Sequence, residues 1–171
     1  MHFDIHVDPA EIALRLGLAV LFGLLLGIDR QLRGHSAGMR THMLVALGAA
    51  VTTIIAFELY DALQARHQDT AGDPLRVIEG MIAAVGFLGG GAIIRGDGGV
   101  QGLTTAANIW VCGGVGLACG AGHYVIAAIT FGFTVAIVTG MYLLERWLRW
   151  RGAPPDGKAA SAPEAAAAPD R

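Results

Sequence analysis

Two long apolar stretches of this chain are separated by the segment Gly27-Ile-Asp-Arg-Gln-Leu-Arg-Gly-His-Ser-Ala-Gly-Met-Arg-Thr-His42, a dense run of charge in a protein with only 15% charged residues. The two ends of the segment adjoin the apolar stretches directly, at the level where a membrane meets water. The polar residues at these ends are Asp29, Arg30, Arg40, Thr41 and His42. The segment therefore predicts a connection between two membrane-crossing helices and is the first candidate for a functional site.

The composition is typical of a membrane protein. The chain has 171 residues, of which 54% are hydrophobic, and a mean hydropathy of +0.53. Five apolar blocks occupy about residues 10–28, 43–60, 77–94, 103–121 and 124–144. Each approaches the ~20 residues that a helix needs to cross ~30 Å of hydrocarbon, and none shows the alternation of a membrane barrel. We therefore predict an all-α membrane protein with five transmembrane helices in one domain, residues 10–146.

The two ends of the chain are expected to lie outside this domain. Residues 1–9 are predicted to be a short outer tail, in which Asp8-Pro9-Ala10-Glu11 is typical of a helix start with aspartate as the N-cap. A cleaved signal peptide is the competing interpretation of the first block, but the acidic residues before it do not fit one. Residues 147–171 are predicted to be an interfacial anchor followed by a disordered, Ala/Pro-rich cytoplasmic tail.

The distribution of basic residues predicts which way the helices cross. Basic residues dominate the connections after the first and third helices and the region after the fifth. These residues are Arg30, Arg33, Arg40, Arg95, Arg146, Arg149, Arg151 and Lys158. By the positive-inside rule these regions face the cytoplasm. The N-terminus is therefore predicted to be outside and the C-terminus cytoplasmic.

Pairs of glycines four residues apart occur on three of the predicted helices. They are Gly23 and Gly27, Gly86 and Gly90, and Gly116 and Gly120. In lipid, small residues let helices approach closely and gain van der Waals contact. We expect these glycines to be points of tight helix packing.

A few polar residues fall inside the predicted spans. Glu79, near the outer end of the third helix, is either an intramembrane ion ligand or a surface carboxylate paired with Arg76, and the second interpretation is slightly favoured. On the fourth helix, Thr104, Asn108 and Cys112 repeat every four residues in a winding polar stripe. The threonine fits interhelical hydrogen bonding, whereas for Asn108 a packing role and a functional role are equally consistent with the sequence.

The charged segment between the first two helices has two interpretations. Its arginines suffice to hold the connection on the cytoplasmic side. Topology does not require Asp29, however, nor the triplet Arg40-Thr41-His42 at the start of the second helix. We therefore predict a polar cluster that closes the inner face of the bundle.

Enzymatic chemistry is not expected. The sequence contains no membrane-embedded Ser/His pair, no His-Glu-x-x-His motif and no paired aspartates at matching depth. Alternating residues His2, Asp4, His6 and Asp8 are a weak metal pattern at a chain end, and we predict no metal site there. Neither a cofactor nor a nucleic acid is expected as a ligand.

Several motifs resemble the membrane domain of the MgtC/SapB family. They are GLLLGIDRQLRGHSAGMRTHMLVALGAAV, GFLGGGAII, VQGLTTAANIW and GVGLACGAG, in the family's order over about residues 10–145. Family members commonly have GLERE where this chain has GIDRQ, so Asp29 replaces a longer glutamate with its charge kept. They also have AGLRTH and GFLGAG where this chain has AGMRTH and GFLGGG.

The resemblance implies a five-helix domain of the bacterial inner membrane with its N-terminus outside. The family's best-known members support survival in low magnesium and are held to restrain the membrane ATP synthase. They have an ACT-like domain after the fifth helix, which this sequence lacks, so we expect a short SapB-type member. Two functions stay open: a non-enzymatic protein that contacts another membrane complex in magnesium or stress physiology, and a small homo-oligomeric ion or solute transporter or channel.

Overall fold

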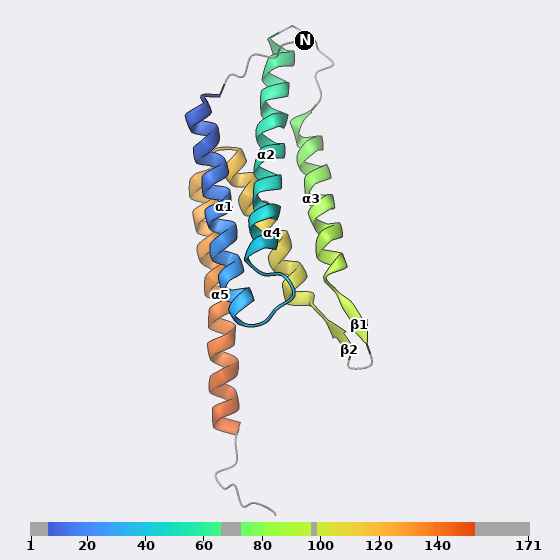
Figure 1. The fold of residues 1–171 in the computed structure, drawn as a ribbon, viewed down its shortest axis with the longest axis vertical. Helices are drawn as coiled ribbons and strands as arrows, with labels where there is room; N and C mark the ends of the chain where they lie inside the picture. Colours follow the sequence, from blue (N-terminus) through green and yellow to red (C-terminus); the bar gives the residue numbers. More distant parts are fainter. Residues whose placement is uncertain (1–6, 66–72, 97–98, 153–171) are drawn as a thin grey trace, which may run out of the picture.

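A computed structural model describes residues 7–65, 73–96 and 99–152, with side chains up to residue 148. The described part of the chain forms five helices and one short hairpin, α1 (Pro9–Leu32), α2 (Met39–Gln64), α3 (Pro74–Gly91), β1 (Ile94–Gly96), β2 (Gly99–Gln101), α4 (Leu103–Gly120) and α5 (Tyr124–Gly152). The helices run alternately up and down as a bundle (Figure 1). The predicted tail at 153–171 and residues 1–6 lie outside the described residues.

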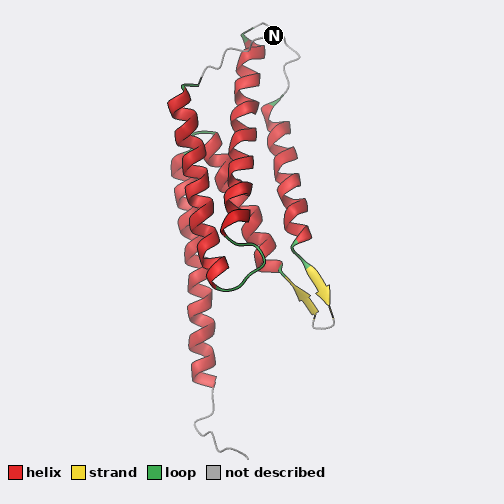
Figure 2. Cartoon of the chain, viewed as in Figure 1, coloured by secondary structure: helices red, strands yellow, loops and turns green. Residues whose placement is uncertain are grey.

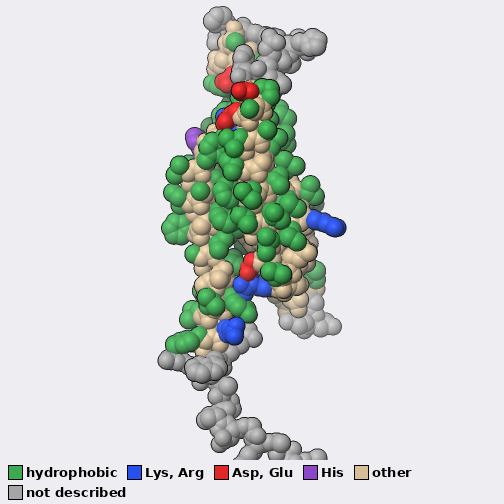
Figure 3. All heavy atoms as spheres, turned by 60° about the vertical axis from the view of Figure 1, so that its left-hand side comes forward, with side chains coloured by type: hydrophobic (Ala, Val, Ile, Leu, Met, Phe, Trp, Pro, Cys, Tyr) green, Lys and Arg blue, Asp and Glu red, His purple; other side chains and the backbone are tan. Residues whose placement is uncertain are grey.

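All five described helices are long and apolar enough to cross a membrane. This confirms the predicted number of candidate spans and the helical fold class. Hydrophobic side chains cover the middle of the face shown in Figure 3, and most of its acidic and basic side chains lie toward the two ends. The bundle therefore has the surface of a protein whose outer face contacts lipid.

The bundle has two distinct ends. At one of them, which we call the hairpin end, α1 turns into α2 through residues 33–38, and the strands of the hairpin connect α3 to α4 (Figures 1 and 2). At the opposite end lie the starts of α1 and α3 and the turn between α4 and α5.

Aspartate side chains fix where two helices start. The Asp8 carboxylate accepts a hydrogen bond from the Ala10 N–H at 3.0 Å, and Pro9 occupies the first helical position. The Asp73 carboxylate does the same for the Leu75 N–H at 2.8 Å. Each carboxylate satisfies a backbone donor that the helix itself leaves free. The predicted N-cap at Asp8 is confirmed.

Several predicted helix boundaries are corrected. The third helix ends at Gly91 rather than at residue 94, and a two-stranded antiparallel hairpin with Ile94 opposite Gln101 follows it. Three successive glycines weaken the end of α3, because each costs about 1 kcal/mol in a helix. The second helix begins at Met39 rather than at residue 43. Hydropathy marks the apolar part of a helix, whereas the helix itself includes its polar first turn.

The tryptophan-rich segment after residue 146 is also helical. The fifth helix continues without interruption to Gly152, beyond the predicted span that ended at residue 144. Trp147 is exposed on this extension. The predicted interfacial anchor is thus the last part of α5.

The fourth helix is the centre of the bundle and contacts all four other helices. It meets α2 through glycines: a Cβ on Gly116 would collide with the carbonyl oxygen of Ala46, and one on Gly120 with that of Ala50. The two backbones are therefore in direct contact, which only glycine permits on the α4 side.

The first helix meets the start of α2 in the same way. A Cβ on Gly23 would lie 2.7 Å from the carbonyl oxygen of His42, and a Cβ on Gly27 would lie 2.5 Å from the Cα of Met39. Both distances are shorter than any normal contact. Two of the three predicted glycine pairs thus lie at close helix contacts.

The third pair behaves differently because α3 is peripheral. A Cβ on Gly86 or on Gly90 would meet no atom within 4 Å. Instead, α3 packs on α4 through Val85 and through Gly89, whose added Cβ would lie 3.1 Å from the carbonyl oxygen of Ala106. The expectation of tight packing at Gly86 and Gly90 therefore does not hold within the chain.

Alanine substitutions on α4 test the backbone contact. We expect Gly116→Ala to destabilise the protein by about 3 kcal/mol, the upper end of the usual range for overpacked cores, because the clash is with backbone that cannot rotate away. Gly114→Ala on the same helix is the control, since its Cβ meets nothing within 4 Å. Thermal unfolding in detergent measures both. Equal stability of the two variants would contradict the contact.

Candidate functional site

A buried arginine joins α1 to α4 at the hairpin end. Arg30 lies in the last turn of α1 and is 3% exposed. Its Nη2 donates a hydrogen bond to Thr105 Oγ1, in the first turn of α4, at 2.7 Å. Its Nε is buried and has no hydrogen-bond partner among the described residues. A charged group is thus held in the bundle by a single neutral hydroxyl.

The neighbouring carboxylate pairs with a different arginine. Asp29 Oδ1 accepts from Arg33 Nε at 2.8 Å and lies 2.6 Å from Arg33 Nη2, one helical turn along. The guanidinium of Arg33 also lies over the ring of Tyr142 on α5, 3.8 Å from its centroid. Asp29 therefore neutralises Arg33, and no salt bridge to Arg30 exists among the described residues.

His42 is buried completely between the helices. Its Nδ1 lies 2.8 Å from the Gly38 carbonyl oxygen, so Nδ1 carries the proton, since a carbonyl can only accept. Its Nε2 has no donor among the described residues. The Sγ of Cys112 on α4 donates to the carbonyl oxygen of His42 at 3.2 Å. These two residues connect α2 to α4.

The structure thus divides the predicted cluster. Arg30 and Asp29 face α4 and α5, and His42 is buried beside α4. Arg40 is exposed and Thr41 is half-buried, and neither forms a side-chain hydrogen bond in the described part of the chain. Arg40 therefore belongs to the surface of the hairpin end.

A cavity of about 850 Å³ opens between α1, α4 and α5 at the hairpin end. Its polar lining residues are Arg30, Arg33, His35, Thr104, Tyr142 and Glu145. Leu32, Ile137, Val138 and Met141 form its apolar wall. The pKa of His35 lies below its ordinary value because of partial burial and because of the positive charge of Arg30. The cavity thus combines a positive region with an apolar surface.

A smaller cavity of about 60 Å³ lies deeper between the same helices. Asp29 and Asn108 line it together with Thr134 and Thr139. Asp29 Oδ2 and Asn108 Oδ1 are both buried there without a hydrogen-bond partner among the described residues. The space suffices for water, which would satisfy both oxygens.

The predicted intramembrane residues do not form one path. Thr104 lines the larger cavity and Asn108 the smaller one, whereas Cys112 faces α2. Glu79 is exposed on α3, lines neither cavity, and forms no ion pair with Arg76 in the described part of the chain. Among the described residues, Glu79 therefore has neither the companions of an intramembrane ion site nor the expected pairing with Arg76.

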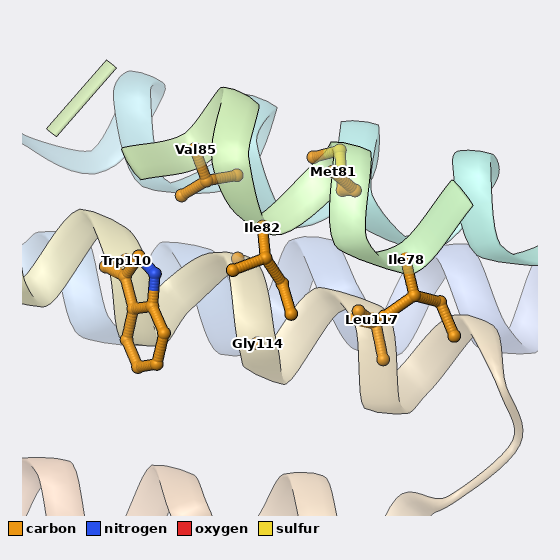
Figure 4. Close-up of a pocket in the computed structure, with 8 residues that line it drawn as sticks. Ile78, Met81, Ile82, Val85, Trp110, Gly114 and Leu117 are labelled. Atoms are coloured by element: carbon orange, nitrogen blue, oxygen red, sulfur yellow. The ribbon is translucent and has the colours of Figure 1, made fainter. Parts of the chain in front are cut away.

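A third cavity, of about 190 Å³, lies between α3 and α4 and is apolar (Figure 4). Ile78, Ile82, Val85, Trp110 and Leu117 are among its lining residues. No charged residue lines it. It marks the loose packing of the peripheral helix and contributes nothing to the polar site.

A separate polar contact fastens the opposite end. Arg15 pairs with Glu11 at 2.9 Å and donates through Nη1 to the carbonyl oxygen of Gly120 at 2.9 Å. The hydroxyl of Tyr124 donates to the Glu11 carboxylate. All of these groups act within the bundle, so the contact joins α1 to the turn between α4 and α5.

Sequence reasoning missed several residues of the site. The positive-inside rule accounts for Arg33 by topology alone, although its position four residues after Asp29 is the spacing of a helical ion pair. Thr105, beside the predicted Thr104, holds Arg30. Tyr142 and Glu145 come from α5, and nothing in their local sequence indicates that they lie beside α1.

These observations define a class: a membrane protein with a five-helix bundle and a polar site at one end. The chain belongs to the MgtC family, whose model matches residues 16–147. The resemblance identified from the motifs is thereby confirmed.

Three relatives illustrate the match. "Protein SapB" of Bacillus subtilis is 38% identical over 120 residues, covering 70% of this chain and 51% of SapB. "Protein MgtC" of Brucella abortus is 39% identical over 130 residues, covering 75% of this chain and 50% of that protein. "Putative magnesium transporter YhiD" of Escherichia coli is 39% identical over 116 residues, covering 67% of this chain and 53% of that protein. The chain thus spans about half the length of these relatives, and no solved structure matches it significantly.

The titration of His35 tests the electrostatics of the larger cavity. Because Arg30 helps to lower the pKa of His35, Arg30→Gln should raise that pKa toward its ordinary value of about 6.5. Arg95→Gln is the control, since Arg95 is exposed on β1 and lines none of these cavities. Histidine NMR, with His35→Gln to assign the signal, measures the pKa. An unchanged value in Arg30→Gln would mean that the two groups do not interact.

Proposed function

We propose that this chain is a non-enzymatic protein of the bacterial inner membrane that acts in magnesium limitation or stress by contacting another membrane complex. The contact is made by the hairpin end, which faces the cytoplasm, with the N-terminus outside. The ATP synthase is the first candidate for that complex, on the family resemblance alone.

The charges at the two ends support this orientation. Five arginines lie at the hairpin end: Arg30, Arg33, Arg40, Arg95 and Arg146. Among them, only Arg33 forms a described ion pair, with Asp29. At the opposite end Arg15 is neutralised by Glu11. An excess of arginine at one end favours the cytoplasmic side for that end.

One observation carries the proposal: the two polar cavities found among the described residues lie in the hairpin half of the bundle. Both are lined by α1, α4 and α5 near the α1–α2 connection, and Glu79 lines neither. A site at one membrane surface suits binding of a partner or ligand, whereas transport needs a polar route to the other surface. The names of the relatives supply the physiological setting, since one is named for magnesium transport.

Capture of partners from membranes tests this function. Arg40→Gln removes an exposed charge from the hairpin end without breaking a described contact, so it should reduce the captured complex and impair growth at limiting magnesium. Arg76→Gln is the matched control, because Arg76 is exposed near the opposite end. Affinity purification after cross-linking in cells, with the protein level measured, reports both. Equal capture by the two variants would place the contact elsewhere.

A second candidate function is a small homo-oligomeric ion or solute transporter. Its support is the pair of unpartnered buried oxygens, Asp29 Oδ2 and Asn108 Oδ1, on the smaller cavity. Oxygen atoms of this kind are ligands for hard cations. The exposed glycines Gly86 and Gly90 of α3 would be available for contact with further copies.

Ion flux in proteoliposomes distinguishes the two functions. If the chain transports a cation through the smaller cavity, Mg²⁺ flux should exceed that of empty vesicles and should fall at least about tenfold in Asp29→Asn, which removes the ligand charge. The proposed binding function instead predicts no flux above empty vesicles in either protein. The thermal stability of both proteins is measured in parallel, so that loss of flux is separated from loss of fold.

A further inference from the structure

The guanidinium of Arg30 has no ion-pair partner among the described residues. The side chain is 3% exposed and its one described hydrogen bond goes to the neutral hydroxyl of Thr105. Its Nε is buried without a partner among the described residues, and the adjacent Asp29 is paired with Arg33. A buried charge without a direct ion-pair partner is unfavourable at the edge of a bilayer. An anion at this position would supply a direct partner for the guanidinium.

The larger cavity brings further donors to the same place. Arg33 lines it, held in position by Asp29 and by the ring of Tyr142. Thr104 lines it from the first turn of α4, a helix of 18 residues whose N-cap is Gly102 and which has no side-chain cap. The free N–H groups and the dipole at such a helix start favour an anion. Two guanidinium groups and a helix N-terminus therefore converge on one cavity.

The depth and the wall of the cavity suit a membrane ligand. Arg30 is in the last turn of α1, and the lining residues of α5 lie about four to six turns, or roughly 20 to 32 Å, after its start, so the cavity reaches the far edge of ~30 Å of hydrocarbon. Leu32, Val138 and Met141 give the cavity an apolar side. Basic cavities between helices at a membrane surface bind lipid headgroups.

We propose that the cavity between α1, α4 and α5 binds a phosphate group, held by Arg30 and Arg33 at the N-terminus of α4. The phosphate belongs either to a phospholipid headgroup, which the apolar wall favours, or to a free phosphate compound. The inference rests on the proposed function only in taking the hairpin end to lie at a membrane surface, and it requires no partner complex.

Glu145 gives the proposal a test of sign. It lines the same cavity from α5, so its negative charge opposes an anion there. Glu145→Gln should therefore tighten phosphate binding several-fold, whereas a cation or an ammonium group would bind more weakly to the same variant.

Binding is measured on the purified full chain in a maltoside detergent that contains no phosphate. The probes are dihexanoylphosphatidylglycerol, inorganic phosphate and, as a lipid without phosphate, dihexanoylglycerol. Native mass spectrometry and thermal shift report saturable binding. We expect Arg30→Gln and Arg33→Gln to weaken binding at least about tenfold, because each removes a charge-assisted hydrogen bond. Arg95→Gln, an exposed arginine that does not line the cavity, should bind as the unaltered protein does.

The outcomes separate the two sources of phosphate. Binding of the phospholipid alone assigns a headgroup site, and binding of inorganic phosphate as well assigns a site for free phosphate. Equal binding of dihexanoylglycerol, no binding of either phosphate probe, or tighter binding absent from Glu145→Gln would overturn the proposal. If Arg30→Gln does not fold, Arg33→Gln and Glu145→Gln decide. Failure here with partner capture intact would leave the proposed function standing.

Discussion

The rest of the structure depends on the direct approach of α1 and α4 to the backbone of α2. Four glycines make this approach, Gly23, Gly27, Gly116 and Gly120, and a single added carbon at any of them would meet backbone atoms below normal contact distance. In lipid there is little hydrophobic gain from burying apolar side chains, so backbone proximity supplies the packing energy. The same approach sets the last turn of α1 beside the first turn of α4. Only there can a side chain from α1 hydrogen-bond to Thr105, so helix packing and the polar site are one constraint.

Much of this arrangement is readable from sequence, and the unreadable part has a physical cause. Apolar block length gives the five helices, and Asp8 with proline gives the first cap, because both signals are local. The glycine pattern indicates close contacts but not which helix is peripheral, so Gly86 looks equivalent to Gly116. The second apolar block starts at residue 43, although α2 begins four residues earlier, at Met39. The stacking of Arg33 on Tyr142 joins residues more than a hundred positions apart, which one sequence cannot register.

The charged segment between α1 and α2 serves more than one purpose. In a count of net charge the arginines of this segment are equivalent. In the structure, however, Arg33 is neutralised, Arg30 is buried and Arg40 is exposed. The difference follows from helical periodicity: Asp29 and Arg33 are one turn apart on the same face, whereas Arg30 points toward α4. His42 is placed by α2 against Cys112 and forms no ion pair among the described residues. Residues that are adjacent in sequence thus serve topology, ion pairing and packing separately.

Arg30 joins two helix ends of opposite partial charge, the C-terminus of α1 and the N-terminus of α4. A helix C-terminus carries partial negative charge and a helix N-terminus partial positive charge. Arg30 lies in the last turn of α1, where its charge is favoured, and reaches the first turn of α4, where it is not. If the arginine lay farther from α4, the start of α4 would lose an unfavourable positive charge. Its free N–H groups would still lack a capping acceptor, since α4 starts at Gly102 without a side-chain cap. The anion proposed for the cavity would satisfy the arginine and the helix start at once. The geometry of the α1–α4 contact therefore creates a position that favours negative charge, and Glu145 of α5 is the acidic residue that lines the same cavity.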